Sequence, residues 1–144
     1  MKKLIFLLTV FCASYFNVAQ ATRLSLNEPT ALGVYSNKIL DAFENQRSNL
    51  QIEGQGTVIK VLPDDTHGSR HQRFIIQLAS GQTLLIAHNI DLAPRINGLS
   101  KGDRIEFAGE YEWNHKGGLI HWTHRDPAMR HAGGWLKHRG KLYQ

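Results

Sequence analysis

The sequence predicts a mainly β protein, a small five-stranded barrel of the OB type with one N-terminal helix and a C-terminal hairpin tail. Two observations carry this prediction. Between residues 50 and 126, short segments alternate apolar and polar residues with the period of half-buried strands, and turn-forming stretches separate them. The first segment is long and has Gly54 and Gly56 on its apolar face, where a strand that bends around a barrel needs small residues. A two-sheet sandwich is the alternative, because patterning alone does not exclude it.

The first 21 residues have the pattern of a secretory signal peptide. Lys2 and Lys3 give a basic start, residues 4–11 form an apolar run, and Ala19-Gln20-Ala21 matches the small-residue cleavage pattern. The apolar run is too short to span a bilayer, and no other stretch approaches the required length. We therefore expect a periplasmic or secreted protein that is cleaved after Ala21 and has no transmembrane segment in its mature chain. A retained amphipathic anchor is the alternative.

The chain divides into a signal peptide (1–21), a lead-in and helix (22–49), the OB-like barrel (50–126) and a basic tail packed on the barrel (127–144). The helix is expected from Ser36, a good N-cap residue, to about Arg47. Its buried side is expected to carry Ile39, Leu40 and Phe43.

The composition fits one domain that is held by its core rather than by disulfides. The 144-residue chain has one cysteine, Cys12, and this residue lies in the expected signal peptide. Removal of Lys2 and Lys3 lowers the formal net charge from +5 to +3. Residues 116–144 hold six lysines and arginines against Asp126 alone, and they include four of the eight histidines. The mature chain has no phosphate loop and no cysteine nucleophile, which disfavours those enzyme classes.

The first strand is expected from Leu50 to Leu62, followed by a loop over residues 63–69. A turn at residues 79–81 joins the second and third strands, whose inner faces are marked by Phe74, Ile76 and Leu78 and by Leu84, Ile86 and His88. An irregular crossover over residues 89–100 and a tight turn at 101–103 then lead to the fourth strand. A terminal hairpin is expected to turn at Arg139-Gly140.

The fourth and fifth strands are expected to form a hairpin with an aromatic inner face and an acidic outer face. A four-residue loop at residues 115–118 pairs Asn114 with Leu119. The pairs that follow are Trp113 with Ile120, Tyr111 with Trp122, Glu112 with His121 and Glu110 with Thr123. This register assigns Trp113, Trp122, Tyr111 and Phe107 to the core.

Five stretches of the chain resemble a bacterial family of small secreted proteins. They are residues 62–65 (LPDD), 68–74 (GSRHQRF), 87–95 (AHNIDLAPR), 109–126 (GEYEWNHKGGLIHWTHRD) and 134–135 (GW). That family is described only as a domain of unknown function, so the resemblance implies no activity. The layout of signal peptide, helix and five strands is also similar to that of periplasmic bacterial OB-fold proteins, and such a likeness in fold does not imply function.

Four residues near the end of the fifth strand are candidate metal ligands: His121, His124, Asp126 and His131. Imidazole and carboxylate groups are ordinary ligands of zinc and related metals. In a regular strand His121 and His124 lie on opposite faces, so they converge only if the strand ends or bulges near Thr123. The alternative is a strand end whose histidines bond to backbone and carboxylate groups.

Six residues at one end of the barrel are candidate ligand-binding groups: Arg70, His71, Arg73, His88, Asp91 and Arg95. Pairing of Gln72 with His88 brings the two halves of this set together. Guanidinium groups suit phosphate or carboxylate, and histidine can transfer a proton. The alternative is a buried ion network that closes the barrel end, with Asp91 pairing with Arg70 or Arg95.

Glu110, Glu112 and His121 are candidate catalytic residues on the outer face of the hairpin. Two carboxylates on one face can serve general acid–base catalysis or bind a cation. The alternative is a solvated face on which Glu112 and His121 form a weak cross-strand pair.

These features predict a secreted binding module for an anionic polymer, nucleic acid or saccharide, or for a small polar ligand. One alternative is a metal-dependent hydrolase of phosphodiester type, in which the histidines hold a divalent metal such as zinc and arginines neutralise phosphate charge. Another is a structural envelope protein. The sequence leaves open whether the protein is an enzyme and what its oligomeric state is.

Overall fold

The computed structural model describes the backbone of residues 31–144 and the side chains of residues 37–144. The expected signal peptide and the lead-in up to residue 30 lie outside the described residues. Within the described part, no helix is long and apolar enough to cross a membrane.

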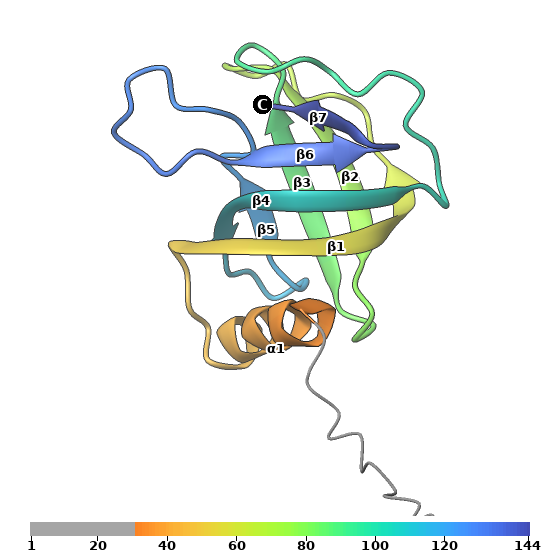
Figure 1. Ribbon diagram of the computed structural model, residues 1–144, viewed down its shortest axis with the longest axis vertical. Helices are drawn as coiled ribbons and strands as arrows, with labels where there is room; N and C mark the ends of the chain where they lie inside the picture. The colour runs from red at the N-terminus through yellow and green to blue at the C-terminus, as the bar shows by residue number, and fades with distance from the viewer. Residues whose placement is uncertain (1–30) are drawn as a thin grey trace, which may run out of the picture.

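Seven strands of the described chain form one sheet, and five of them close into a barrel (Figure 1). The strands are β1 (Leu50–Val61), β2 (His71–Gln77), β3 (Thr83–Asn89), β4 (Arg104–Glu112), β5 (Leu119–His121), β6 (Trp135–His138) and β7 (Lys141–Tyr143). The order β1-β2-β3-β5-β4 is closed by pairing of β4 with β1. β3 and β5 run parallel, whereas the other pairs are antiparallel. The predicted five-stranded barrel is confirmed, and β6 and β7 extend it.

Strand β1 bends so that it pairs with β4 along its N-terminal part and with β2 along its C-terminal part. Gly54 and Gly56 lie in this bend. A Cβ atom at Gly54 would lie 2.8 Å from the ring of Phe107, and one at Gly56 would lie 2.8 Å from the carbonyl oxygen of Gln77. The two glycines therefore allow the closed sheet to pack without overlap.

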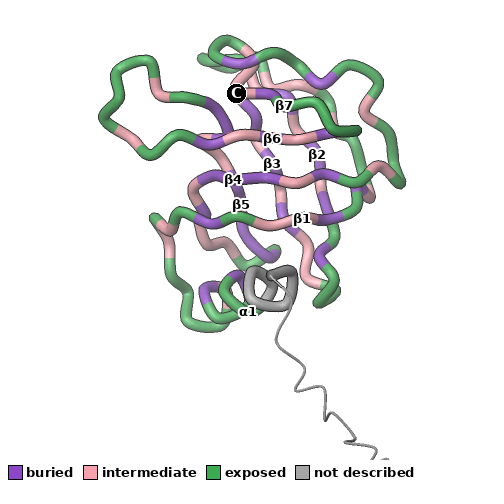
Figure 2. Tube along the Cα trace, viewed as in Figure 1, coloured by how far each residue is buried: buried purple, intermediate pink, exposed green. Residues whose placement is uncertain are grey.

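The core fills the inside of the barrel and is supplied by alternate residues of the strands (Figure 2). Its fully buried side chains include Phe74, Ile76, Leu84, Ile86, Ile105, Phe107, Tyr111, Ile120 and Leu136. In β2 and β3 buried residues alternate with partly exposed ones, as the sequence pattern predicts.

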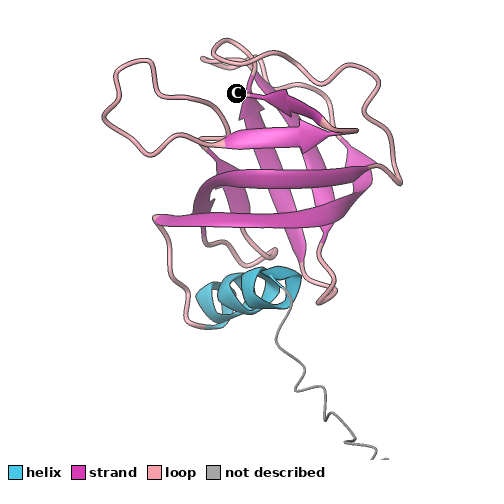
Figure 3. Cartoon of the chain, in the orientation of Figure 1, coloured by secondary structure: helices cyan, strands magenta, loops and turns pink. Residues whose placement is uncertain are grey.

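Helix α1 (Ala31–Glu44) covers one open end of the barrel (Figure 3). Ile39 and Ala42 are buried against the core. The predicted start at Ser36 is wrong, because the helix already begins at Ala31. Serine is favoured as an N-cap but is also tolerated inside helices, so its presence does not fix the start. Leu40, expected on the buried side, is 37% exposed.

The β4–β5 hairpin keeps the predicted acidic outer face but has a different register. Glu110 pairs with His121, Tyr111 with Ile120 and Glu112 with Leu119, which displaces each partner by two residues. Because side chains alternate with a period of two, the displacement leaves Glu110, Glu112 and His121 together on the outer face.

The register differs because the loop, residues 113–118, is longer than expected and is stabilised by hydrogen bonds within it. The side-chain oxygen of Asn114 accepts hydrogen bonds from the backbone N–H groups of Lys116 (2.9 Å) and Gly118 (3.3 Å). Trp113 is half-buried and packs against the core, and its indole N–H donates to the Phe43 carbonyl at 3.1 Å.

Strands β6 and β7 form the predicted terminal hairpin. Arg139 and Gly140 both have positive φ values (49° and 79°), as a two-residue type I′ turn requires. β5 and β6 pair with different halves of β4, so the connecting loop, residues 122–134, projects from the barrel between them (Figure 1).

Candidate functional site

Strand β5 ends abruptly, and this break shapes the site. Pairing stops at His121, and Trp122 has a φ of 50°, which is rare for a bulky residue. His121 and His124 therefore line the same hollow, although regular alternation would place them on opposite faces. The assignment of Trp122 to the core is wrong: its side chain is half-buried, lines this hollow and does not face Tyr111.

The hollow, which we call the histidine hollow, has a volume of about 220 Å³. It is lined by Ser69, His71, Asn89, Leu92, His121, Trp122 and His124. These residues come from the start of β2 and the loop before it, the end of β3 and the loop after it, and the segment that begins at the end of β5. The hollow is thus formed by segments that are distant in the sequence and that the barrel topology brings together at one end of the barrel.

Several polar atoms of the histidine hollow remain available to a ligand. His71 Nδ1 lies 2.7 Å from the Ser69 carbonyl oxygen, and His124 Nδ1 lies 2.7 Å from the Arg125 carbonyl oxygen. A carbonyl only accepts, so each Nδ1 carries the proton and each Nε2 is left for other partners. Asn89 Oδ1 accepts from the backbone N–H of Asp91 at 2.9 Å, so its NH₂ group is the donor that remains.

His88, a predicted ligand residue, lies buried and does not line the hollow. Its Nδ1 is 2.8 Å from the Thr123 hydroxyl, and its Nε2 is 3.2 Å from the Pro94 carbonyl oxygen. Nε2 must donate to the carbonyl, so Nδ1 accepts from the hydroxyl. Burial lowers the pKa of His88 to about 4, which keeps the ring neutral. His88 therefore holds Thr123 in place at the break after β5.

The three arginines of the predicted ligand set are engaged in ion pairs. Arg70 pairs with Asp91 at 2.7 Å, Arg95 with Asp64 at 3.0 Å and Arg73 with Asp65 at 3.6 Å. The backbone N–H and then the guanidinium of Arg70 hold the pKa of Asp91 below its usual value. The arrangement matches the ion-network alternative, except that the pairs are partly exposed instead of buried. Of the six predicted ligand residues, His71 alone lines the hollow.

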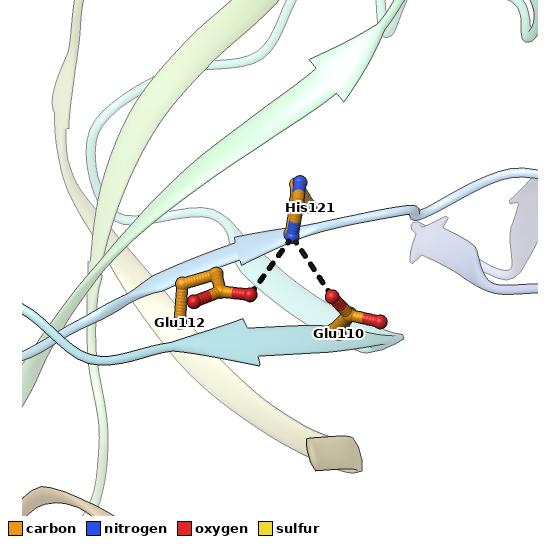
Figure 4. Close-up of side chains that lie close together, drawn as sticks. All are labelled: Glu110, Glu112 and His121. Atoms are coloured by element: carbon orange, nitrogen blue, oxygen red, sulfur yellow. Dashed lines mark ion pairs between the residues drawn. The ribbon is translucent and has the colours of Figure 1, made fainter. Parts of the chain in front are cut away.

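The predicted catalytic residues form a cluster on the outer face of β4 and β5 (Figure 4). His121 Nε2 lies 3.5 Å from Glu110 Oε1 and 3.9 Å from Glu112 Oε1. Among the described residues, this buried nitrogen has no hydrogen-bond partner. His121 thus lines the histidine hollow and also directs its Nε2 toward the two carboxylates.

His131 joins this cluster from the loop. Its Nε2 lies 2.5 Å from Glu110 Oε2, its Nδ1 lies 2.7 Å from the Ala132 carbonyl oxygen, and its ring stacks on Trp122. The hydrogen bond to Glu110 raises the pKa of His131. Burial alone would raise the pKa of Glu110, but the hydrogen bond and charge of His131 outweigh it and lower that pKa. The pair is therefore an imidazolium and a carboxylate.

Asp126 organises the loop instead of joining the cluster. Its carboxylate accepts hydrogen bonds from the backbone N–H groups of Ala128, Arg130 and His131 at 2.8–2.9 Å. The first two of these bonds are the main reason why the pKa of Asp126 is lowered. The structure does not bring His121, His124, Asp126 and His131 together as one ligand set. In the described chain, the residues whose ligand atoms lie within 4.8 Å of one another are Glu110, Glu112 and His121.

A second hollow lies on the outer face of β2 and β3, beside the β4–β5 loop. Its volume is about 460 Å³, and it is bordered by Leu62, Ile75, Thr83, Leu85, Asn114, His115, Lys116 and Gly118. OB barrels commonly bind ligands on this face. We call it the aliphatic groove, because Leu62, Ile75 and Leu85 supply its apolar surface.

Sequence reasoning missed Ser69, Asn89, Leu92 and Trp122 as lining residues. None of them belongs to a recognisable ligand motif, and Trp122 falls in an alternating pattern that is typical of core residues. The available signal was Asp126-Pro127, which marks the strand end and makes convergence of His121 with His124 possible.

The chain belongs to the family described as protein of unknown function (DUF3465), which matches residues 24–144. This membership confirms the resemblance to an uncharacterised family. No curated protein matches the chain at a significant level.

Proposed function

We propose that this member of the DUF3465 family is an exported binding module that holds an anionic group, such as a phosphate, in the histidine hollow. The observation that carries the proposal is the convergence of His71, His121 and His124 on one hollow. Export rests on the N-terminal sequence pattern alone and stays a prediction.

The chemistry of the hollow supports an anionic or polar ligand. His71, His124 and Asn89 line the same small space, and their bonds to Ser69, Arg125 and Asp91 leave the two Nε2 atoms and the NH₂ group for other partners. A protonated imidazole donates from both ring nitrogens and carries a positive charge, and charge-assisted hydrogen bonds to oxyanions are stronger than neutral ones. The nearby arginines already have aspartate partners, so the histidines provide the contacts.

The size of the hollow supports recognition of a single group. Pockets for drug-sized ligands usually occupy roughly 300–1,000 Å³, whereas the histidine hollow measures about 220 Å³. A phosphate or one sugar unit fits this space better than a whole nucleotide. A polymer would then bind through one unit in the hollow and through further contacts along the basic segment, residues 116–144.

Binding of inorganic phosphate and of a short single-stranded oligonucleotide, measured by calorimetry at two salt concentrations, tests the proposal. We expect His71→Ala and His124→Ala each to weaken binding about tenfold, the effect of losing one hydrogen bond to a charged group. Oligonucleotide affinity should fall steeply with salt. His115→Ala, on the exposed β4–β5 loop, is the matched control and should bind normally. Equal losses in all three variants, or no binding of either probe, would refute the proposal.

A second candidate function, a phosphodiester hydrolase, is favoured by one observation. His121 borders the hollow and also contacts Glu110 and Glu112, so potential acid–base groups lie next to the proposed phosphate position. Chelator-sensitive cleavage of the oligonucleotide that is lost in Glu112→Gln would make this the better assignment.

A further inference from the structure

We propose that Glu110, Glu112 and His121 bind a divalent metal ion of the zinc or manganese class on the outer face of β4 and β5. This site goes beyond the proposed function and does not depend on it. It uses the Nε2 atom of His121 with the two carboxylates, whereas the donors of the proposed anion site come from His71, His124 and Asn89.

The sheet places the three ligands by simple rules. Glu110 and Glu112 are two residues apart on β4, so their side chains leave the same face. The observed register sets His121 directly opposite Glu110 and diagonal to Glu112. Figure 4 shows the ring nitrogen of His121 directed at both carboxylates. All three residues lie on paired strands, which are more rigid than loops.

The distances match those between ligands of one ion. Bonds of about 2.0–2.2 Å to a tetrahedral metal separate neighbouring ligand atoms by roughly 3.4 Å. His121 Nε2 is 3.5 Å from Glu110 Oε1 and 3.9 Å from Glu112 Oε1. These separations are too long or poorly oriented for hydrogen bonds, yet Nε2 is buried and has no other partner in the described chain. A buried polar atom normally has a partner, and a metal ion between the three groups would provide one.

His131 is the positioning residue of this site. It binds Glu110 Oε2 at 2.5 Å, which leaves Glu110 Oε1 turned toward His121. The ring is itself fixed by the Ala132 carbonyl oxygen and by stacking on Trp122. Such outer hydrogen bonds orient metal-binding carboxylates and histidines in many proteins.

The ligand set indicates the class of metal. Magnesium and calcium favour sites made of oxygen atoms alone, whereas one imidazole with two carboxylates suits zinc, manganese or ferrous iron. Three protein ligands leave at least one coordination position for water or for an anion.

Titration of the metal-free purified protein with Zn²⁺ and with Mn²⁺ by calorimetry tests this site. We expect one ion per chain, and at least tenfold weaker binding in His121→Gln and in Glu112→Gln. His131→Phe, which keeps an aromatic ring against Trp122 but has no donor for Glu110, should weaken binding about tenfold, as loss of an outer hydrogen bond does. Glu106→Gln is the matched control, because Glu106 lies on the same strand but pairs with Lys137. This variant should bind the metal like the parent protein.

Absence of binding, or unchanged binding in both His121→Gln and Glu112→Gln, would overturn the metal site. His71→Ala and His124→Ala distinguish this outcome from failure of the proposed function. They should weaken phosphate binding and leave metal binding intact. Loss of metal binding in these two variants would place the ion in the histidine hollow and would also overturn the site. Because Glu112 is 32% exposed, its glutamine variant should fold normally and keep the test decisive.

Discussion

At the scale of single residues, Glu110 and Asp126 show that similar carboxylates have different contacts in the folded chain. Glu110, Glu112 and His121 were predicted as one set, and they lie together because alternation on a strand is a local rule. Asp126 was predicted as a metal ligand and instead accepts hydrogen bonds from the backbone of its own loop. Nothing in the local sequence distinguishes a carboxylate that bonds to the backbone of its own loop from one that belongs to a binding site.

His88 makes stability depend on pH in a definite direction. Its folded pKa of about 4 lies below the ordinary value of 6.5, so between these values the unfolded chain binds more protons than the folded chain. Its contribution is therefore complete above about pH 6.5 and is lost as the pH falls toward 4. Between pH 7.5 and pH 5 the free energy of unfolding should drop by about 2 kcal/mol from this group.

Urea unfolding of the parent protein and of His88→Gln at both pH values checks this prediction. The variant should be less stable at pH 7.5, because the bonds to Thr123 and Pro94 are disturbed. Its further loss on moving to pH 5 should be smaller than that of the parent by about 2 kcal/mol. An identical loss in both proteins would show that His88 is not buried as a neutral ring.

At the scale of elements, strands were easier to predict than their ends. The alternation of β2 and β3 and the pairing of Gln72 with His88 follow from sequence pattern and from the turn between the strands. The register of β4 and β5 did not follow, because the hydrogen bonds of the Asn114 side chain favour a six-residue loop over a four-residue loop. Asp126-Pro127 indicates that the strand ends nearby, but the position of the break at Trp122 was not predictable, since a tryptophan with positive φ is held there by the surrounding packing.

The β4–β5 loop should be sensitive to substitution at Gly118. Its φ is 113°, and a Cβ atom there would overlap the ring of Tyr111. Gly98 is a suitable comparison, because its φ is 73° and an added Cβ would meet open space. Gly98→Ala should cost about 1–2 kcal/mol for the backbone alone. Gly118→Ala should cost at least ~1–3 kcal/mol more, since the core must also move. Equal costs in urea unfolding would contradict the observed loop.

At the scale of the whole molecule, the closed barrel was predictable because several independent features of the sequence favour it. Strand alternation, the bend at Gly54 and Gly56, and the turn before β4 all favour one architecture. The position of the candidate site was less predictable. The residues that line the histidine hollow come from segments far apart in the chain, and they meet only through closure of the barrel and the break after β5.

Two hollows of the described fold, the aliphatic groove and the histidine hollow, differ in chemistry. The aliphatic groove lies on the face that OB barrels commonly use, and Leu62, Ile75 and Leu85 supply its apolar surface. The histidine hollow lies at the end of the barrel and offers ring nitrogens and an amide group. An oxyanion requires hydrogen-bond donors, which the Asn89 amide and the protonated imidazoles of His71 and His124 supply, so the hollow is the better site for it.

Nuclear magnetic resonance of the histidine, isoleucine and leucine side chains during titration with inorganic phosphate tests the central claim most directly. The account predicts that the signals of His71, His121 and His124 shift together with one dissociation constant, while those of His67 and His115 stay in place. Shifts centred on His115, Ile75 and Leu85, with unchanged signals from His71 and His124, would place the ligand in the aliphatic groove and contradict the account.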